Sequence, residues 1–334
     1  MKISVYGLGQ FGYALLKHLD VNNNGRYHLF ANARNLDLLS YLRQHRRHQY
    51  LYPAVEVSDT IIFEDDPCAL AMGSDVIILA VKSDAIREVL SQMKSVLKKG
   101  VIILNTAKAL ADEGEPISQV VSDVMAGYPY EYAILAGGTI ASDLFRHEPL
   151  GTDIACESLV VSKKISGILR SGSLSVYPST DVIGVEYASA FKNVISILAG
   201  IVRGMGFSYG SQTHTISRTA YEVERLVVNE LGGESETFFM NSQCWGNDMW
   251  MSCTGNTRNR QFGVLLGEGM SVDDALSEMR GQHKEVEGIK TVQVLSHFKR
   301  IESYPFLNFI NQFVNRFDTL EHLKELLLTQ KYSR

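Results

Sequence analysis

Residues 2–12, which read KISVYGLGQFG, decide the fold class of this chain. The β-rich run of residues 2–6 leads directly into glycines spaced as G-x-G-x-x-G, and residues 13–19 then have the composition of a helix. Residues 22–25 (NNNG) predict a turn, and residues 27–31 (YHLFA) predict the next strand. A strand–helix–strand unit of about 30 residues is typical of one half of a doubly wound, nucleotide-binding sheet.

The glycine motif consists of Gly7, Gly9 and Gly12, with Gln10 and Phe11 between the second and third glycine. Glycines at this spacing permit a tight turn and let the backbone approach a pyrophosphate, which is bound at the positive N-terminus of the following helix. We therefore predict that this motif binds a dinucleotide cofactor. An ordinary glycine-rich turn is the alternative, because the pattern alone is a weak signal.

The end of the second predicted strand indicates which nucleotide is preferred. An NAD enzyme usually has an aspartate or glutamate there for the ribose 2′-hydroxyl, but residues 30–34 (FANAR) contain no carboxylate. Asn32 and Arg34 are the polar side chains of this segment, and Arg34 can meet a 2′-phosphate. The sequence therefore favours NADP or the use of both cofactors, with a solvated surface arginine as the alternative.

The alternation of strands and helices continues through the first half of the chain. Residues 75–81 (DVIILAV) are nearly all apolar, as expected for a strand that is buried on both faces of a parallel sheet. Asp65 or Asp66 can cap a helix at residues 67–72. Further strands are predicted at residues 60–63, 101–105, 133–137, 158–162 and 174–177, and a further helix at residues 85–97. We expect an α/β fold with a doubly wound sheet of the Rossmann type.

The distribution of the 7 prolines divides the chain, because none falls between Pro178 and Pro305 and proline breaks helices. Helices are predicted at residues 182–202, 215–231, 235–239, 258–266, 272–280 and 286–298 and twice in the tail, with Gly267 as a C-terminal cap. We therefore predict a dinucleotide-binding domain at residues 1–178 and an all-helical substrate and catalytic domain at residues 179–334.

Composition narrows the function classes. The chain has 334 residues, and its 32 basic against 37 acidic side chains give a net charge of −5, so a nucleic-acid-binding or basic membrane-surface protein is not expected. The 4 cysteines form no C-x-x-C pair and the 9 histidines no metal motif, so no metal is expected. No G-x-S-x-G elbow or Walker loop suggests a hydrolase or kinase. Residues 1–7 do not resemble a signal peptide, and residues 194–202 are too short to span a bilayer, which favours a cytoplasmic protein without a membrane partner.

The long apolar helix predicted at residues 182–202 carries a lysine. Ala188 precedes Lys192 by one turn and Ser196 follows it by one turn, so its neighbours on the helix are small or apolar. Lysine is rarely buried without a purpose, and desolvation would lower its pKa toward neutrality and allow general-base catalysis. Snorkelling of the ammonium group to the surface is the alternative.

Asp248 lies among Trp245, Met249, Trp250 and Met251 in the sequence. A carboxylate in apolar surroundings needs a partner, and a cationic lysine would serve. We therefore predict that Asp248 pairs with a lysine, with an aspartate of a turn or helix cap as the alternative.

A phosphate site is predicted where Thr257, Arg258 and Asn259 precede the apolar helix of residues 262–266. Thr257 is a credible N-cap, so the backbone N–H groups of the first turn would point at an anion that Arg258 and Asn259 also contact. An exposed basic turn is the alternative.

Three further candidates follow predicted strands. Lys108 comes after the strand at residues 101–105, and Gly137 and Thr139 lie at the end of the strand at residues 133–137. The carboxyl ends of parallel strands form the edge at which open α/β folds bind ligands. We expect these residues at a ligand site or, as the alternative, in ordinary loops.

These segments, in this order, resemble the nicotinamide-dependent glycerol-3-phosphate dehydrogenases. The similarity is most specific over residues 184–207, from GVEYASAFKNVI to GMGF, and over residues 258–263, RNRQFG. Looser matches are the glycine motif and residues 80–83, 107–108, 137–141 and 286–288, so the resemblance covers about residues 1–300. It implies a Rossmann-type N-terminal domain and an all-α C-terminal domain like that of 6-phosphogluconate dehydrogenase.

The resemblance also implies roles for individual residues. Lys192 resembles the family's catalytic proton acceptor, and Lys108 its second lysine, which contacts both substrate and cofactor. Substrate positions of the family are matched by Gly137, Thr139, Lys192, Asp248, Thr257, Arg258 and Asn259. Cofactor positions are matched by Gln10, Phe11, Lys108, Ala141, Arg258, Glu285 and Glu287. Dimers are common in the family, so a homodimer is expected.

Several residues depart from the family's pattern. Gly138 and Lys82 stand where prolines are usual, and Ser252 replaces a threonine. Residues 244–247 (CWGN) replace a glycine-rich approach to the aspartate, and residues 210–214 (GSQTH) replace an Asp-Asn-x-Lys-like stretch. The proton-transfer and phosphate residues are retained while the pocket walls differ, so the reaction type is better determined than the substrate.

We therefore expect a cytosolic oxidoreductase that interconverts dihydroxyacetone phosphate and sn-glycerol 3-phosphate with NAD(P)H, supplying phospholipid synthesis. Its active site is expected in a cleft between the two domains, which Lys108 and Thr139 reach from the nucleotide side. Two alternatives stay open: the same hydride transfer on another phosphorylated or anionic ketone, and a nucleotide-binding sensor without turnover. The retention of both lysines and of Asp248 argues against the sensor.

Overall fold

The computed structural model describes residues 1–52, 54–111 and 113–329. The chain forms two compact units. The first unit comprises Met1–Lys108 and Pro116–Val182, and the second comprises Ala109–Glu115 and Ile183–Arg334. The short segment Ala109–Glu115 thus belongs to the second unit, although it lies between two strands of the first unit in the sequence.

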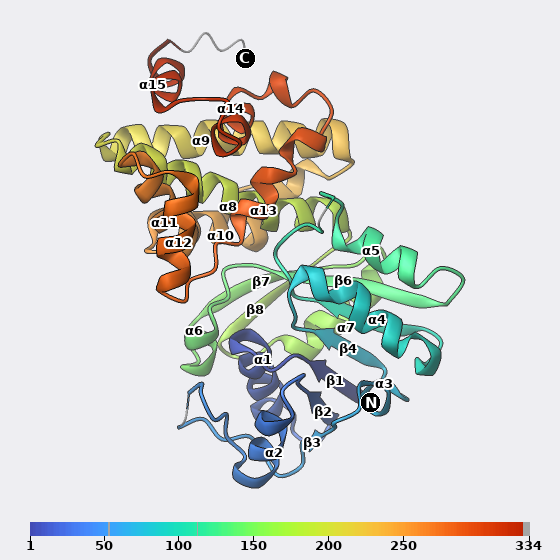
Figure 1. Cartoon of the computed structure of the whole chain (residues 1–334). Coiled ribbons are helices and arrows are strands. Elements are labelled where there is room, and N and C mark those ends of the chain that lie inside the picture. Colours follow the sequence, from blue (N-terminus) through green and yellow to red (C-terminus); the bar gives the residue numbers. More distant parts are fainter. Residues whose placement is uncertain (53, 112, 330–334) are drawn as a thin grey trace. The chain divides into compact units, whose positions relative to one another are not determined.

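The first unit is built on an eight-stranded sheet (Figure 1). Its strands are β1 (Lys2–Tyr6), β2 (His28–Asn32), β3 (Ile62–Phe63), β4 (Val76–Leu79), β5 (Val101–Asn105), β6 (Tyr130–Ala136), β7 (Leu150–Ala155) and β8 (Leu174–Ser179). They lie in the order β3-β2-β1-β4-β5-β6-β7-β8, and neighbouring strands are parallel except β6 and β7. This order confirms the predicted α/β, Rossmann-type fold class. Strands β2 and β3 follow on one side of β1, and the chain then returns to add β4 and the later strands on the other side.

Helices cover both faces of this sheet (Figure 1). On one face, α1 (Gln10–Val21), α2 (Leu36–His45), α6 (Ala141–Phe145) and α7 (Leu159–Leu169) share a core with alternate strand residues such as Ile3 and Val5. On the other face lie α3 (Pro67–Ala71), α4 (Ile86–Met93) and α5 (Ile117–Val124). Since successive strand residues point to opposite faces, the fully buried strands β4 and β5 contribute to both cores.

One strand prediction in this unit is wrong. Residues 158–162 begin helix α7, because the Ser158 hydroxyl accepts a hydrogen bond from the Val161 backbone N–H (3.4 Å) and so caps the helix. The strand of this region is β7, and helices α2 and α5 also lie where no element is predicted. The proposed cap Asp66 is confirmed, since its carboxylate accepts from the Cys68 N–H at 2.9 Å.

The second unit consists of helices and loops over its described residues (Figure 1). Its α-helices are α8 (Val182–Gly204), α9 (Tyr209–Leu226), α10 (Asp248–Thr254), α11 (Arg258–Gly267), α12 (Val272–Gly281), α13 (Gly288–Gln293), α14 (Pro305–Val314) and α15 (Leu320–Thr329). Short π-helical turns at Val227–Leu231 and Gln243–Asn247 extend α9 and precede α10. Among the described residues, α8 is long and apolar enough to cross a membrane, but 94% of its most apolar stretch is buried, as in a core helix.

Helices α8 and α11 approach each other through glycines. A β-carbon at Gly200 or Gly263 would lie 2.2 or 2.0 Å, respectively, from a backbone oxygen of the opposite helix. One turn further on, Gly204 and Gly267 meet the opposite helix in the same way. The prediction that Gly267 is a C-terminal cap is therefore wrong, because α11 continues through Gly267 and this glycine is needed for close packing.

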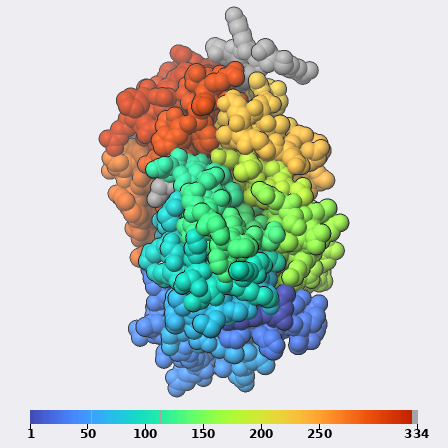
Figure 2. Space-filling view, turned by 90° about the vertical axis from the view of Figure 1, so that its right-hand side faces the viewer, coloured from blue at the N-terminus to red at the C-terminus, as the bar shows by residue number. Residues whose placement is uncertain are grey.

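Helix α14 is held on α9 by a buried carboxylate. Glu222 Oε2 accepts hydrogen bonds from the backbone N–H groups of Phe306 (2.9 Å) and Leu307 (3.0 Å), and so satisfies two donors of the first turn of α14. Burial raises the pKa of Glu222 to about 7. In Figure 2 the red surface of these C-terminal helices adjoins the yellow surface of the segment that contains α9.

We expect Gly263→Ala to lower the free energy of unfolding by about 1–3 kcal/mol, because the added methyl group meets backbone rather than a flexible side chain. Gly281→Ala is the matched control, since no atom lies within 4 Å of its β-carbon position. That substitution in α12 should be neutral or stabilise the fold by about 0.5–1 kcal/mol. Urea unfolding followed by circular dichroism measures both, and equal stabilities of the two variants would contradict the close contact of α8 and α11.

Glu222→Gln should change how stability depends on pH. Since folding raises the pKa of this carboxyl from 4.5 to about 7, its contribution to stability is fully present below pH 4.5 and is lost as the pH rises through 7. Glutamine keeps an oxygen acceptor for α14 but cannot ionise. In urea unfolding, the free energy of unfolding of the variant should therefore rise by roughly 2–3 kcal/mol relative to the wild type between about pH 5 and about pH 8. A stability difference that is independent of pH would refute the buried, protonated carboxyl.

Candidate functional site

The glycine motif forms the turn from β1 into α1. Gly7 has a positive φ of +99°, and a β-carbon there would lie 2.5 Å from the Ala80 carbonyl oxygen, while one at Gly12 would lie 1.9 Å from the Gly7 oxygen. Around the β-carbon position of Gly9, in contrast, no atom lies within 4 Å. Gly9 is also the N-cap of α1 and has no side chain to cap the helix. The turn therefore fits a pyrophosphate, because it has open space in front of an uncapped helix N-terminus.

The residues at the end of β2 and just after it differ in what their side chains contact. Asn32 is buried, and its Nδ2 donates to the carbonyl oxygens of Glu64 (2.7 Å) and Asp65 (3.1 Å). Its amide therefore joins β2 to the loop after β3. Arg34 is exposed, so its guanidinium is accessible to a nucleotide phosphate. Asn32 Oδ1 is buried and has no hydrogen-bond partner in the described part of the chain, whereas the Arg34 side chain is exposed to solvent.

His48, which no sequence motif predicts as a site residue, lies beside the glycine motif. Its Nε2 donates to the Leu8 carbonyl oxygen (3.0 Å), and its Nδ1 accepts from the backbone N–H groups of Tyr50 and Leu51 (3.1 Å each). This pattern requires the neutral imidazole with the proton on Nε2. Burial lowers the pKa of His48 and favours that form. His48 therefore holds the glycine turn in place through its hydrogen bond to Leu8, although it lies about 40 residues away in the sequence.

Lys108, Gly137 and Thr139 meet at the carboxyl ends of β5 and β6. The Gly137 carbonyl oxygen accepts from Lys108 Nζ (2.5 Å) and from the Thr139 backbone N–H (2.8 Å). A β-carbon at Gly137 would lie 2.7 Å from the Thr152 Cα, so only glycine fits there. The Thr139 hydroxyl is buried and makes no hydrogen bond within the described part of the chain. Ala141 follows at the start of α6. The expectation that these residues share one sheet edge is thus met by the geometry.

Lys192 and Asp248 form a buried ion pair. Lys192 Nζ of α8 lies 2.5 Å from Asp248 Oδ2, at the start of α10, and their side chains are 6% and 0% exposed. Trp245 and Met249, which flank the aspartate, are buried as well. Lys192 therefore does not snorkel to the surface, and Asp248 is not the N-cap of α10, which is Asn247. A buried lysine with one carboxylate partner can hold a proton and exchange it with a bound molecule.

At the start of α11, backbone N–H groups are available to an anion, because no side chain caps the helix. Thr257 is the N-cap residue, but its hydroxyl donates to the Ser252 carbonyl oxygen (2.8 Å) and lies 3.2 Å from the Ser196 hydroxyl, so it does not cap the helix. The first-turn N–H groups are therefore not occupied by the N-cap side chain. Arg258, the first residue of α11, is half-exposed and pairs with Glu287 at 3.8 Å.

Asn259 acts as a joint between three helices. Its Nδ2 donates to Asn193 Oδ1 of α8 (3.0 Å), and its Oδ1 accepts from the Gly288 N–H at the start of α13 (3.0 Å). The side chain is buried and already engaged in these contacts. Its predicted place near the phosphate site therefore rests on its backbone position in α11. Glu285 and Glu287, the other cofactor candidates of this unit, are exposed in the loop before α13.

Known proteins match most of this chain, including both sets of candidate residues, those of the first unit and those of the second. Family models described as the N-terminus and the C-terminus of NAD-dependent glycerol-3-phosphate dehydrogenase match residues 2–161 and 181–324. The glycerol-3-phosphate dehydrogenase (NAD(P)+) of Syntrophomonas wolfei is 31% identical over 297 residues, or 88% of this chain and 84% of that protein. The corresponding protein of Chlorobium phaeobacteroides is 32% identical over 302 residues, or 88% and 86%.

This chain belongs to the NAD-dependent glycerol-3-phosphate dehydrogenase family. The resemblance read from the sequence is therefore confirmed. Solved structures share the fold: the glycerol-3-phosphate dehydrogenase of Plasmodium falciparum has a TM-score of 0.90 at 15% identity, covering 100% of this chain and 96% of that chain. That of Coxiella burnetii has a TM-score of 0.84 at 24% identity, covering 98% of each chain.

Arg260 of this glycerol-3-phosphate dehydrogenase family member has a structural role that its sequence motif does not predict. Its guanidinium is largely buried, and Nη1 donates to the carbonyl oxygens of Thr254 (3.0 Å) and Gly255 (3.4 Å), while Nη2 donates to Gln212 Oε1 (3.1 Å). Arg260 thus fixes the turn between α10 and α11. The sequence signal for Arg260 is that RNR (residues 258–260) places a third polar residue directly before the apolar helix residues 262–266.

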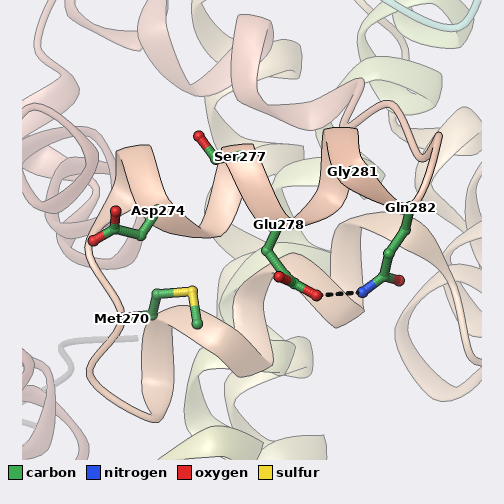
Figure 3. A pocket seen from close by; sticks show the side chains of 6 residues that line it. All are labelled: Met270, Asp274, Ser277, Glu278, Gly281 and Gln282. Atoms are coloured by element: carbon green, nitrogen blue, oxygen red, sulfur yellow. Dashed lines mark hydrogen bonds between the residues drawn. The ribbon is translucent and has the colours of Figure 1, made fainter.

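A hollow on α12 of this family member carries none of the predicted site residues. Figure 3 shows it, lined by Met270, Asp274, Ser277, Glu278, Gly281 and Gln282. The Gln282 amide donates to Glu278 Oε1 at 2.8 Å. Within residues 1–52, 54–111 and 113–329 no group of His, Cys, Asp and Glu side chains is arranged to hold a metal ion. Asp274 and Glu278 of this hollow therefore do not form a metal site. The hollow is an acidic surface depression outside the candidate site.

Proposed function

We propose that this chain is a cytoplasmic, homodimeric glycerol-3-phosphate dehydrogenase that interconverts dihydroxyacetone phosphate and sn-glycerol 3-phosphate with NAD(P)H and supplies phospholipid synthesis. The observation that carries the proposal is the buried Lys192–Asp248 pair, with its Nζ–Oδ2 distance of 2.5 Å. Family membership supports the reaction class. In this proposal residues 1–178 hold the nucleotide and residues 179–334 hold the substrate and transfer the proton.

The residues present fit a nicotinamide dinucleotide, because Gly9 leaves open space before the uncapped N-terminus of α1. When bound, the reduced cofactor supplies the hydride that the carbonyl carbon C2 of the substrate accepts. The residues assigned to cofactor binding are Gly7, Gly9, Gln10, Phe11, Gly12, Asn32, Arg34, Lys108, Ala141, Arg258, Glu285 and Glu287. Arg34 is exposed, so it is the residue proposed to meet a 2′-phosphate.

Lys192 carries the proton in this scheme. In reduction its ammonium group donates a proton to the C2 oxygen, and in oxidation its amine takes that proton back. Asp248 Oδ2 holds Nζ in place and stabilises its charged form, so the proton remains available although the lysine is buried. Lys108 provides a second positive charge that stabilises the developing negative charge on the same oxygen.

The phosphate is held at the start of α11. Arg258 and the first-turn N–H groups, including that of Asn259, contact the phosphate, while the Thr257 hydroxyl stays bound to Ser252. Gly137 and Thr139 bind the substrate from the edge formed by β5 and β6. The buried Thr139 hydroxyl supports this assignment, because a substrate oxygen would give it a hydrogen-bond partner.

The reaction is tested with a panel of substrates. Dihydroxyacetone phosphate, other ketone phosphates and keto acids are each incubated with NADPH or NADH, and cofactor absorbance is followed. We expect dihydroxyacetone phosphate to give the highest kcat/KM. A higher value for another ketone phosphate would reassign the substrate and keep the chemistry. Tight cofactor binding without oxidation by any panel member would replace the enzyme with a nucleotide-binding sensor.

Lys192→Met should lower kcat by roughly 10²–10⁴-fold, because it removes the proton donor and keeps most of the side chain's volume. Cofactor binding, measured by quenching of protein fluorescence, should be unchanged, since the glycine motif is untouched. The double variant Lys192→Met/Asp248→Leu is the control for folding, because it removes the uncompensated buried carboxylate. Near-normal turnover of either variant at saturating substrate would exclude Lys192 as the proton donor.

Arg34→Ala should raise the KM for NADPH by about 10-fold or more, because it removes a charge-assisted hydrogen bond to the 2′-phosphate. The KM for NADH should stay within about twofold. Arg146→Ala is the matched control, since Arg146 is an exposed arginine of the first unit that pairs with Asp143. An equal rise for both cofactors would move the contact of Arg34 to a part that NADH and NADPH share, and no effect on either would assign this arginine to the solvated surface.

A further inference from the structure

A second hollow of the second unit lies between α9 and the segment that runs from residue 238 to α10. Its volume is about 420 Å³, and its walls include Tyr221, Phe238, Met240, Trp245 and Trp250. We call it the α9–α10 pocket. This volume is within the range of small-molecule sites, which have about 300–1,000 Å³. Phe238 and Trp245 form a rigid wall, with their rings edge to face at a centroid distance of 5.0 Å.

The pocket exposes apolar side chains that the fold itself does not cover. Trp250 is 58% exposed, and Met240 is 65% exposed. The chain has 2 tryptophans, and both line this pocket. Large apolar groups gathered in one concave place mark a binding site more than single exposed residues do. The α9–α10 pocket therefore has the wall chemistry of a ligand site.

Two of the segments that depart from the family's pattern border this pocket. Trp245 belongs to residues 244–247, which replace a glycine-rich approach to Asp248, and Thr213 belongs to residues 210–214, which replace an Asp-Asn-x-Lys-like stretch. They are more than 30 residues apart in sequence, yet each contributes a side chain to the same cavity. Their convergence supports a ligand site built by these departures.

The charge of the pocket selects its ligand. Glu224 is the carboxylate of the lining. The other polar groups there are uncharged: hydroxyls of threonine, serine and tyrosine, two tryptophan indole N–H groups and the Cys253 thiol. Arg218 and Arg225 lie over the Tyr221 ring at 5.7 and 5.8 Å from its centroid, and neither lines the cavity. Aromatic faces and a carboxylate both attract a cation and disfavour an anion. The pocket thus suits a molecule with an apolar body and a positively charged end.

We propose that the α9–α10 pocket binds a small aromatic or similarly apolar amine and acts as an effector site for the Lys192–Asp248 pair. Met249, Trp250 and Cys253 line the pocket from α10, and Asp248 is the first residue of that helix. A ligand in the pocket therefore contacts the helix that presents the carboxylate to Lys192. The effector role rests on the proposed function, whereas ligand binding does not.

Binding is tested on the full chain with three probes of similar shape: phenethylamine, phenethyl alcohol and hydrocinnamate. Each probe is titrated while tryptophan fluorescence is followed, because both tryptophans line the pocket. We expect the amine to bind about fivefold or more tighter than the alcohol, and the carboxylate to bind weakest. Equal affinities of the amine and the carboxylate would refute the proposed ligand class.

Variants locate the site. Glu224→Gln should abolish the preference for the amine, and Ala220→Phe, which fills the cavity from α9, should lower the affinity for all three probes at least tenfold. Glu278→Gln is the matched control, because it removes a carboxylate from the acidic hollow on α12 (Figure 3) and should change nothing. Binding that persists in Ala220→Phe, or that Glu278→Gln removes, would place the probes elsewhere and overturn the proposal.

Two further measurements decide the effector role and the competing occupant. Saturating phenethylamine should change kcat for dihydroxyacetone phosphate at least threefold in the wild type and not in Ala220→Phe. An unchanged kcat would refute the effector role, while a chain that binds the amine but reduces no ketone would refute the proposed function alone. If Ala220→Phe dissociates a dimer in sedimentation velocity and no probe binds, a second copy of the chain covers this face and the ligand site is rejected.

Discussion

The contact between α8 and α11 is the constraint on which the second unit depends. Glycines on both helices let their backbones approach so closely that a β-carbon at any of the four positions would collide with a carbonyl oxygen at 2.0–2.3 Å. The spacing of the two axes is therefore set by backbone and not by side-chain rotamers. Nearer the N-terminus of α8, Ser196 donates to the Ser252 carbonyl oxygen of α10 and lies beside the Thr257 hydroxyl before α11. Asn193 accepts from Asn259, and Lys192 pairs with Asp248 of α10. One helix thus sets the position of each element of the candidate site in this unit.

Burying the Lys192–Asp248 pair in this unit costs free energy. Taking two charges out of water costs several kcal/mol per ion, and a well-packed apolar pair of the same volume is often at least as stable. The aspartate is fully buried among Trp245 and Met249, so stability alone does not explain why the pair is kept. The proposed proton-transfer role would explain it, because a lysine shielded from water exchanges its proton with a bound substrate rather than with solvent.

The sequence predicts best where one interaction dominates the local energy. The βαβ unit follows from the glycine motif and its flanking apolar runs, and the pairing of Asp248 with a lysine follows from two charges in apolar surroundings. It predicts poorly where two local signals compete. Residues 158–162 contain the valines of a strand, but the Ser158 cap decides for a helix. Gly267 looks like a cap, but packing against α8 uses it. The contacts of His48 and Arg260 join segments far apart in sequence, so no spacing rule contains them.

The N-terminus of α11 shows how a local sacrifice can indicate function. Threonine is a good N-cap, and a missing cap costs a helix about 1 kcal/mol. Thr257 nevertheless donates its hydroxyl to the Ser252 carbonyl oxygen, so the N-cap residue of α11 is tied to α10 at the expense of the cap. A capping hydroxyl would compete for the same N–H groups as a bound anion. In the proposed function, the free N–H groups, the helix dipole and Arg258 would all act on one phosphate. Asn259 of the same helix donates to Asn193, the residue after Lys192. In the proposed function, the missing side-chain cap of α11 is therefore a condition for binding a phosphorylated substrate next to Lys192.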